Sequence, residues 1–215
     1  AMQCGSRERF CEAHTIDPKR PILVHIGRIA HEKNIEFLLD VLDRVRGKFP
    51  DVLMVIAGEG PARRSLLRKT AALGLQKNVR FVGYLKRGPE LWDCFCAGDA
   101  FVFASSTETQ GLVLLEAMAL GVPVVSTAVM GTKDILDAGR GALVATETVD
   151  DFCGKLTRLL SDRNLRQRLS VEAHGYAEEW SAERNAERLV DFYELMLKQH
   201  SARSAAGDIV ADPGN

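Results

Sequence analysis

The sequence has no run of about 18 apolar residues, the length that a membrane-spanning helix requires. Its start, AMQCGSRERF, lacks the apolar core of a secretory signal. We therefore expect a soluble, cytoplasmic protein, and peripheral contact with the inner face of a membrane stays open. An excess of charge of one sign is also missing, because 28 lysines and arginines face 29 aspartates and glutamates. This balance does not favour nucleic acid as a partner.

The five cysteines form neither a disulfide framework nor a zinc motif. Cys94 and Cys96 are two residues apart in a predicted helix, so they lie on different faces of that helix. The odd number and the scatter of the cysteines are typical of reduced thiols. We expect no metal ion and no other cofactor.

Several familiar catalytic signatures are absent as well. No G-x-x-x-x-G-K-[ST] loop occurs, which argues against a P-loop NTPase. The turn GRIAHEKN has one glycine instead of the three of a dinucleotide-binding fingerprint, and GEGPAR has arginine at the third glycine position. Neither a G-x-S-x-G nucleophile elbow nor an H-E-x-x-H zinc helix is found.

What the sequence does contain is a regular alternation of short β-rich runs and helical patterns from residue 21 to about 145. Several runs are almost wholly apolar, as in parallel strands that are covered on both faces. Between the runs, residues such as Ile35, Leu38 and Leu42 recur at helical spacing. This order predicts an α/β fold, a Rossmann-like doubly wound parallel sheet. The predicted strands are 21–27, 51–58, 78–83, 99–105, 122–127 and 141–145.

After residue 145 the strand pattern stops. Helices are predicted over 149–160, 162–179 and 181–199, with Asp162 and Ser181 as N-caps. The remaining residues are small and polar without periodicity, which predicts a disordered tail. The expected organisation is a segment before the first strand (1–20), a Rossmann-like domain (21–180), a C-terminal helix (181–199) and the tail (200–215).

The stretch ETQGLVLLEAMALG, residues 108–121, carries two glutamates in largely apolar surroundings. If a helix begins near Gly111, the residues three and four positions from Glu116 are all apolar, so a solvated stripe does not explain this glutamate. Glu116 then pairs with a basic side chain, reaches water past Ala119, or binds a ligand. Helical side chains lean toward the N-terminus, so its carboxylate is expected where the strand 99–105 ends and the helix begins.

The beginning of that helix suits an anion such as a diphosphate, because unpaired N–H groups and the positive end of the helix dipole lie there. A carboxylate repels phosphate but accepts hydrogen bonds from vicinal sugar hydroxyls. We therefore assign Glu116 to a ribose beside a diphosphate, and Glu108 to hydroxyls farther along the ligand. Arg28 and Lys33, just after the first strand, would hold the phosphate oxygens. Ordinary surface charge is the alternative, although cations at a helix start oppose its dipole.

Four motifs in this order and spacing, GRIAHEKN, GEGP, NVRFVGYL and ETQGLVLLEAMALGVPVVST, resemble the C-terminal domain of retaining glycosyltransferases of family 4, which have the GT-B fold. The resemblance covers about residues 21–199, and Glu108 and Glu116 form its E-x7-E element. It implies that the chain is the donor half of a hexosyltransferase. The donor would be a nucleoside diphosphate sugar with UDP or GDP, and no metal ion is implied. The N-terminal acceptor domain would be missing, and residues 1–20 would be a remnant of the interdomain linker.

The resemblance also implies roles for single residues. Arg28, Lys33 and Glu108 would be catalytic, the two cations by stabilising the leaving diphosphate and Glu108 by contacting the transferred sugar. The main chain near Leu85 would contact the base. The glycines of GEGP would shape a loop beside the nucleotide or, equally, a turn that enters a helix. The expected donor-binding residues are Gly27, Arg28, Lys33, Gly58, Leu85, Glu108, Thr109, Gln110, Gly111, Leu112 and Glu116.

Gln110 stands where the family commonly has an aromatic residue, and similar E-T-Q-G forms occur among glycolipid-forming members. The expected acceptor is a glycan or a glycolipid, which a membrane surface would present. Two alternatives stay open at this point: a regulatory module that binds a nucleotide without turnover, and an epimerase that acts on nucleotide sugars.

Overall fold

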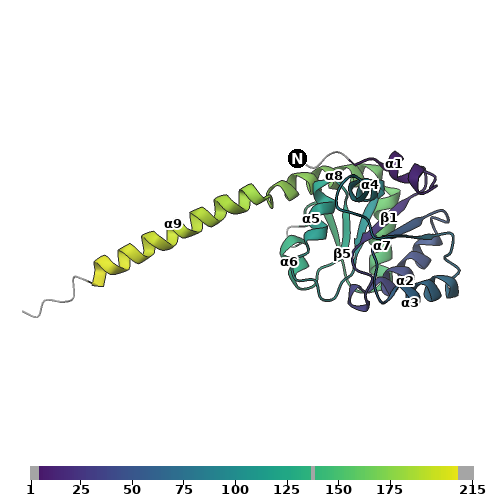
Figure 1. The fold of residues 1–215 in the computed structure, drawn as a ribbon, viewed down its shortest axis with the longest axis horizontal. Coiled ribbons are helices and arrows are strands. Elements are labelled where there is room, and N and C mark those ends of the chain that lie inside the picture. The colour runs from purple at the N-terminus through teal and green to yellow at the C-terminus, as the bar shows by residue number, and fades with distance from the viewer. Residues whose placement is uncertain (1–4, 137–138, 208–215) are drawn as a thin grey trace, which may run out of the picture. The chain divides into compact units, whose positions relative to one another are not determined.

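The computed structural model describes residues 5–136 and 139–207. The chain divides into two units, residues 1–177 and 178–215. Within the described residues of the first unit, six strands alternate with helices (Figure 1). The strands are β1 (Ile22–Ile26), β2 (Leu53–Ala57), β3 (Val79–Gly83), β4 (Ala100–Phe103), β5 (Val124–Thr127) and β6 (Ala142–Ala145). Each predicted strand is present and slightly shorter than predicted.

The strands form one parallel sheet in the order β3-β2-β1-β4-β5-β6. The chain runs from β1 outward to β3 and then returns to β4, so the direction of winding reverses between β1 and β4. This is the strand order of the Rossmann fold, and ligands of such sheets bind at the carboxyl ends of the strands near the reversal. The predicted fold class is confirmed.

Helices cover both faces of the sheet (Figure 1). Val102 of β4 belongs to a core cluster that also holds side chains of α2, α3 and α7. Its neighbour Phe101 points to the other face, since successive strand residues alternate, and it packs against Phe95 of α4 with ring centroids 5.6 Å apart. The helices of this unit are α1 (Arg7–Ala13), α2 (Ile35–Arg46), α3 (Arg63–Ala72), α4 (Pro89–Ala97), α5 (Leu112–Ala119), α6 (Gly131–Leu136), α7 (Val149–Ser161) and α8 (Arg163–Glu178), with a 3₁₀ turn η1 (His31–Lys33).

Helix α1 lies in the segment 1–20, which we expected to be a linker remnant. Its residues Phe10 and Cys11 are buried. The Arg7 guanidinium forms an ion pair with Asp99 at 3.2 Å, and the same carboxylate accepts the N–H of Ile22, the first residue of β1. Two buried apolar side chains and one arginine thus tie this short helix to the sheet, and its origin as an interdomain linker stays a prediction.

In the second unit, α9 (Ala182–Gly207) begins after Ser181, whose Oγ accepts the N–H of Arg184 as an N-cap. Residues 200–207, which we placed in a disordered tail, are helical. Alanine and arginine favour a helix, and no glycine or proline interrupts the pattern before Gly207. The rest of the predicted tail, 208–215, lies outside the described residues. No helix in the described part of the chain is long and apolar enough to cross a membrane.

Candidate functional site

A cavity of about 470 Å³ lies at the carboxyl ends of β1, β2 and β3. Loops after three strands and the helix α5 contribute to its wall. The cavity brings together five of the predicted site residues: Gly27, Arg28, Gly58, Leu85 and Glu116. The other lining residues are Ile26, Ala57, Glu59, Tyr84, Arg87 and Leu91.

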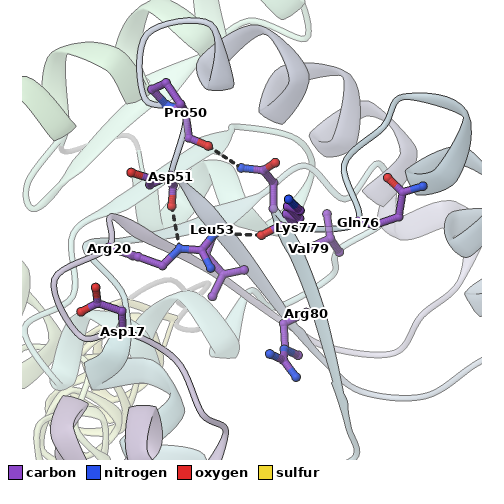
Figure 2. Close-up of a pocket in the computed structure, with 10 residues that line it drawn as sticks. Asp17, Arg20, Pro50, Asp51, Leu53, Gln76, Lys77, Val79 and Arg80 are labelled. Atoms are coloured by element: carbon purple, nitrogen blue, oxygen red, sulfur yellow. Dashed lines mark hydrogen bonds between the residues drawn. The ribbon is translucent and has the colours of Figure 1, made fainter.

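A larger cavity of about 580 Å³ lies at the opposite edge of the sheet, where β2 and β3 begin (Figure 2). Figure 2 shows the Arg20 guanidinium reaching across it to donate to the carbonyl oxygens of Asp51 and Lys77, each at 2.8 Å. The Asn78 amide donates to the carbonyl oxygens of Pro50 and Val52. These bonds join loops to one another. Because ligands of such sheets bind at the carboxyl edge, we place the candidate site in the smaller cavity.

The loops after β1 and β2 are in backbone contact beside the candidate site. The N–H of Gly27 donates to the Ala57 carbonyl, and the N–H of Ile29 donates to the Glu59 carbonyl, each at 3.0 Å. A Cβ atom on Gly58 would overlap the carbonyl oxygen of Gly27. The motif GEGP thus contributes Gly58 and Glu59 to the cavity wall and leads into α3, and its place beside a nucleotide stays a prediction.

Lys33 and Glu108 form an ion pair at one end of this edge. The Nζ–Oε2 distance is 2.8 Å, and each side chain is 19% exposed. The N–H of Gly111 donates to the other carboxylate oxygen at 3.3 Å. Burial by itself would raise the pKa of Glu108, but the Lys33 ammonium and the backbone N–H donors outweigh it, so this pKa lies below its usual value. Glu108 is therefore ionised at neutral pH.

Glu116 forms a second ion pair, with Arg87 of the loop between β3 and α4. The Nη2–Oε1 distance is 2.9 Å, and the side chains of Arg87 and Glu116 are 80% and 29% exposed. Pairing with a basic side chain, one of the alternatives for Glu116, is therefore present in the structure. Arg87 was missed in the sequence. The one available signal was that a glutamate among apolar neighbours needs a partner.

The remaining predicted residues divide between the cavity and the loop before α5. Arg28 is exposed and lines the cavity, and in the described part of the chain its side chain has no acidic partner. Gly111 is the N-cap of α5 with a left-handed φ of 65°, and Leu112 begins the helix. Thr109 and Gln110 are exposed in the same loop. These four loop residues, with Lys33 and Glu108, do not line the cavity.

Residues 6–175 match the family described as glycosyl transferases group 1. The chain belongs to this family. It is 34% identical over 168 residues to the sulfoquinovosyl transferase SQD2 of Arabidopsis thaliana, a match that covers 76% of this chain and 31% of that protein. The chain spans between 30% and 45% of the length of eight such curated relatives.

Two solved structures of glycosyltransferases superpose on most of this chain. Staphylococcus aureus TarM, solved in complex with UDP among other ligands, has a TM-score of 0.73 at 26% identity, over 80% of this chain and 35% of TarM. The C-terminal domain of a group 1 glycosyl transferase, LpcC of Francisella tularensis, has a TM-score of 0.70 at 27% identity, over 82% of this chain and 93% of that domain. The fold is thus that of one Rossmann-like half of a GT-B glycosyltransferase.

Helix α6 of this glycosyltransferase chain supports the loop that carries Glu108, a role that we did not predict. The N–H of Gly131 donates to the Glu108 carbonyl at 2.9 Å. A Cβ atom on Gly131 would overlap the carbonyl oxygen of Thr109. The preceding residue, Met130, has a left-handed φ of 50°, which is uncommon for a residue other than glycine. In the sequence, the available signal for this role was Gly131 itself, a glycine that begins a helix shortly after the strand β5.

His25 lies in β1 behind the same edge and is fully buried. Its Nδ1 is 3.1 Å from the Val102 carbonyl oxygen, and its ring stacks on Phe103 at 5.9 Å. Burial lowers its pKa to about 4; the hydrogen bond to Val102 acts in the opposite direction, and the Lys33 ammonium lowers the pKa further. The ring is therefore neutral at pH 7.

Proposed function

We propose that this chain is the donor-binding half of a retaining glycosyltransferase of family 4. The intact enzyme transfers a hexosyl unit from a nucleoside diphosphate sugar to a glycan or glycolipid. The observation that carries this proposal is the cavity at the carboxyl edge, where Arg28, the backbone of two glycine loops and Glu116 meet. Family membership supports it, as does the similarity to TarM, whose structure holds UDP.

The nucleoside occupies the 470 Å³ cavity. The backbone near Leu85 contacts the base, and the Glu116 carboxylate accepts hydrogen bonds from the ribose hydroxyls. A carboxylate has about four acceptor sites, so it can serve two hydroxyls together. Glu108 receives hydroxyls of the transferred sugar.

The diphosphate lies between Arg28, Lys33 and the first N–H groups of α5. As the bond between the sugar and the diphosphate breaks, negative charge grows on the leaving group, and these cations and N–H groups stabilise it. Lys33 does not need to release Glu108 for this purpose, since an ammonium group has three N–H donors. Arg28, Lys33 and Glu108 are the catalytic residues in this proposal, and the reaction needs no metal ion.

The greater length of the curated relatives supports a second domain in the intact enzyme. An N-terminal domain binds the acceptor and completes the active site, so the isolated chain does not turn over the donor. The enzyme is cytoplasmic and meets a glycolipid acceptor at the inner face of a membrane.

Calorimetric titration of the chain with UDP, GDP and ADP and with their sugars tests this proposal. One nucleotide should bind, its sugar should bind more tightly, and Glu116→Gln and Lys33→Ala should each weaken binding by about tenfold or more. Failure of the wild-type chain to bind any of them would contradict the proposal. Conversion of the sugar without acceptor would indicate an epimerase, and indifference to the sugar would indicate a regulatory module.

A further inference from the structure

Arg87 and Glu116 come from different elements and meet in the wall of the proposed nucleotide cavity. Both line it together with Leu91. The same three residues also line an adjoining recess of about 60 Å³, whose other lining residues are Trp92, Phe95 and Leu120. The ion pair is thus part of the wall common to the cavity and an apolar recess.

The surroundings of Glu116 explain why it needs this cation. An ionised carboxylate beside apolar side chains is unfavourable without a partner, and its three rotatable bonds allow many orientations. In the part of the chain that the structure describes, Arg87 is the basic side chain that pairs with Glu116. The pair uses Oε1, whereas Oε2 has no hydrogen-bond partner among the described residues.

We propose that Arg87 is a positioning residue for the ribose of the donor, an inference that rests on the proposed function. The guanidinium offers a charged N–H donor to Oε1 at 2.9 Å. By holding Oε1 it also restricts the orientation of the carboxylate, with Oε2 free for a ribose hydroxyl. Arg87 therefore acts on the 2′- and 3′-hydroxyls through Glu116 and has no contact with the diphosphate.

The test compares a nucleoside diphosphate with its 2′,3′-dideoxy counterpart by calorimetric titration. UDP is the first probe and GDP the second. Arg87→Ala should weaken binding of the ordinary nucleotide by about three- to fivefold, the range of an exposed ion pair. It should leave binding of the dideoxy nucleotide within about 1.5-fold, because that ligand makes no use of Glu116.

Two variants serve as controls. Arg87→Lys should recover part of the lost affinity, since an ammonium group can pair with one carboxylate oxygen. Lys86→Ala removes the same charge from the neighbouring exposed position, and it should affect both nucleotides equally and only slightly. Arg87 is itself exposed, so its variants should unfold at the same temperature as the wild-type chain.

Equal losses for both nucleotides would overturn the inference, since Arg87 would then act on the phosphates or the base. A second result would also overturn the inference: Arg87→Ala binds the ordinary nucleotide as tightly as the wild-type chain does, while Glu116→Gln no longer prefers it to the dideoxy nucleotide. The proposed function would stand in that case. A wild-type chain that binds no nucleoside diphosphate would instead overturn the proposed function itself.

Discussion

The Lys33 ammonium lies 2.8 Å from a carboxylate oxygen of Glu108. In the proposed function these two groups serve neighbouring parts of one ligand, the diphosphate and the transferred sugar. Their contact shows that the loops after β1 and β4 meet, as the hydrogen bond from the Ser106 N–H to the Glu32 carbonyl at 3.0 Å also shows. The two loops that would hold the donor in the proposed function are therefore joined to each other.

Lys33→Met should weaken binding of a nucleoside diphosphate by about tenfold, because a charge-assisted hydrogen bond to phosphate is lost. The loss should be smaller for the nucleoside monophosphate and absent for the nucleoside, which calorimetric titration can measure. Lys19→Met is the matched control, since Lys19 is exposed and precedes β1 at the opposite edge of the sheet. A loss of the same size for all three ligands would contradict the phosphate role.

Gly58→Ala should destabilise the chain by more than about 2 kcal/mol, because its Cβ would meet the Gly27 carbonyl and its φ of 139° is unfavourable for alanine. Gly154→Ala in α7 is the control, as nothing lies within 4 Å of its Cβ position. It should stabilise the chain by about 0.5–1 kcal/mol. Urea denaturation measures both changes, and equal stabilities of the two variants would refute the close approach of the loops.

The stability of the chain should fall as the pH is lowered from 6.5 to 4. His25 has a folded-state pKa of about 4 against an unfolded value of 6.5, so in this window the unfolded chain binds the proton and the folded chain does not. Stability is then highest above pH 6.5 and decreases until both states are protonated below pH 4, by about 3 kcal/mol from this one group. Denaturation curves across this range provide the measurement.

His25→Phe keeps a ring beside Phe103 and should remove most of this pH dependence, although it leaves the Val102 carbonyl without its partner. Burial also lowers the pKa of His14, so this group also destabilises the fold as the pH falls. It accounts for part of the pH dependence of stability that remains in the His25→Phe variant. An unchanged slope in the His25→Phe variant would show that His25 is not the group responsible.

Arg7→Ala should cost about 2–4 kcal/mol of stability, because it leaves the Asp99 carboxylate without this partner and removes the donor to the carbonyl oxygens of Pro18, Ala97 and Arg20. Arg7→Lys should not restore the loss, since lysine lacks the planar fork of donors. Arg44→Ala is the comparison, because Arg44 pairs with Asp150 at an exposed site and should change stability by less than about 0.5 kcal/mol. Similar losses of stability in Arg7→Ala and Arg44→Ala would show that Arg7 does not hold α1 against the sheet.

Much of the fold was predictable because it depends on local patterns. Apolar runs bounded by turn residues identified all six predicted strands, and the amphipathic repeat in 35–46 identified α2, whose residues Leu38 and Leu42 are buried as expected. Helix α1 escaped prediction, since seven residues are too few for a clear periodicity. The extension of α9 to Gly207 was missed because a polar run of good helix formers has the same composition as a disordered tail.

By itself the sequence determined the parallel α/β architecture and the family, because spacing along one chain carries these features, and it singled out Glu108 and Glu116 as site residues, which stays a prediction. Only the tertiary structure decided that Arg87 meets Glu116 and that Gly58 lies against Gly27. Such contacts join loops from strands that are far apart in sequence but adjacent at one edge of the sheet. Which residues meet there depends on the order of the strands and on the distance between their backbones. A local sequence pattern contains neither.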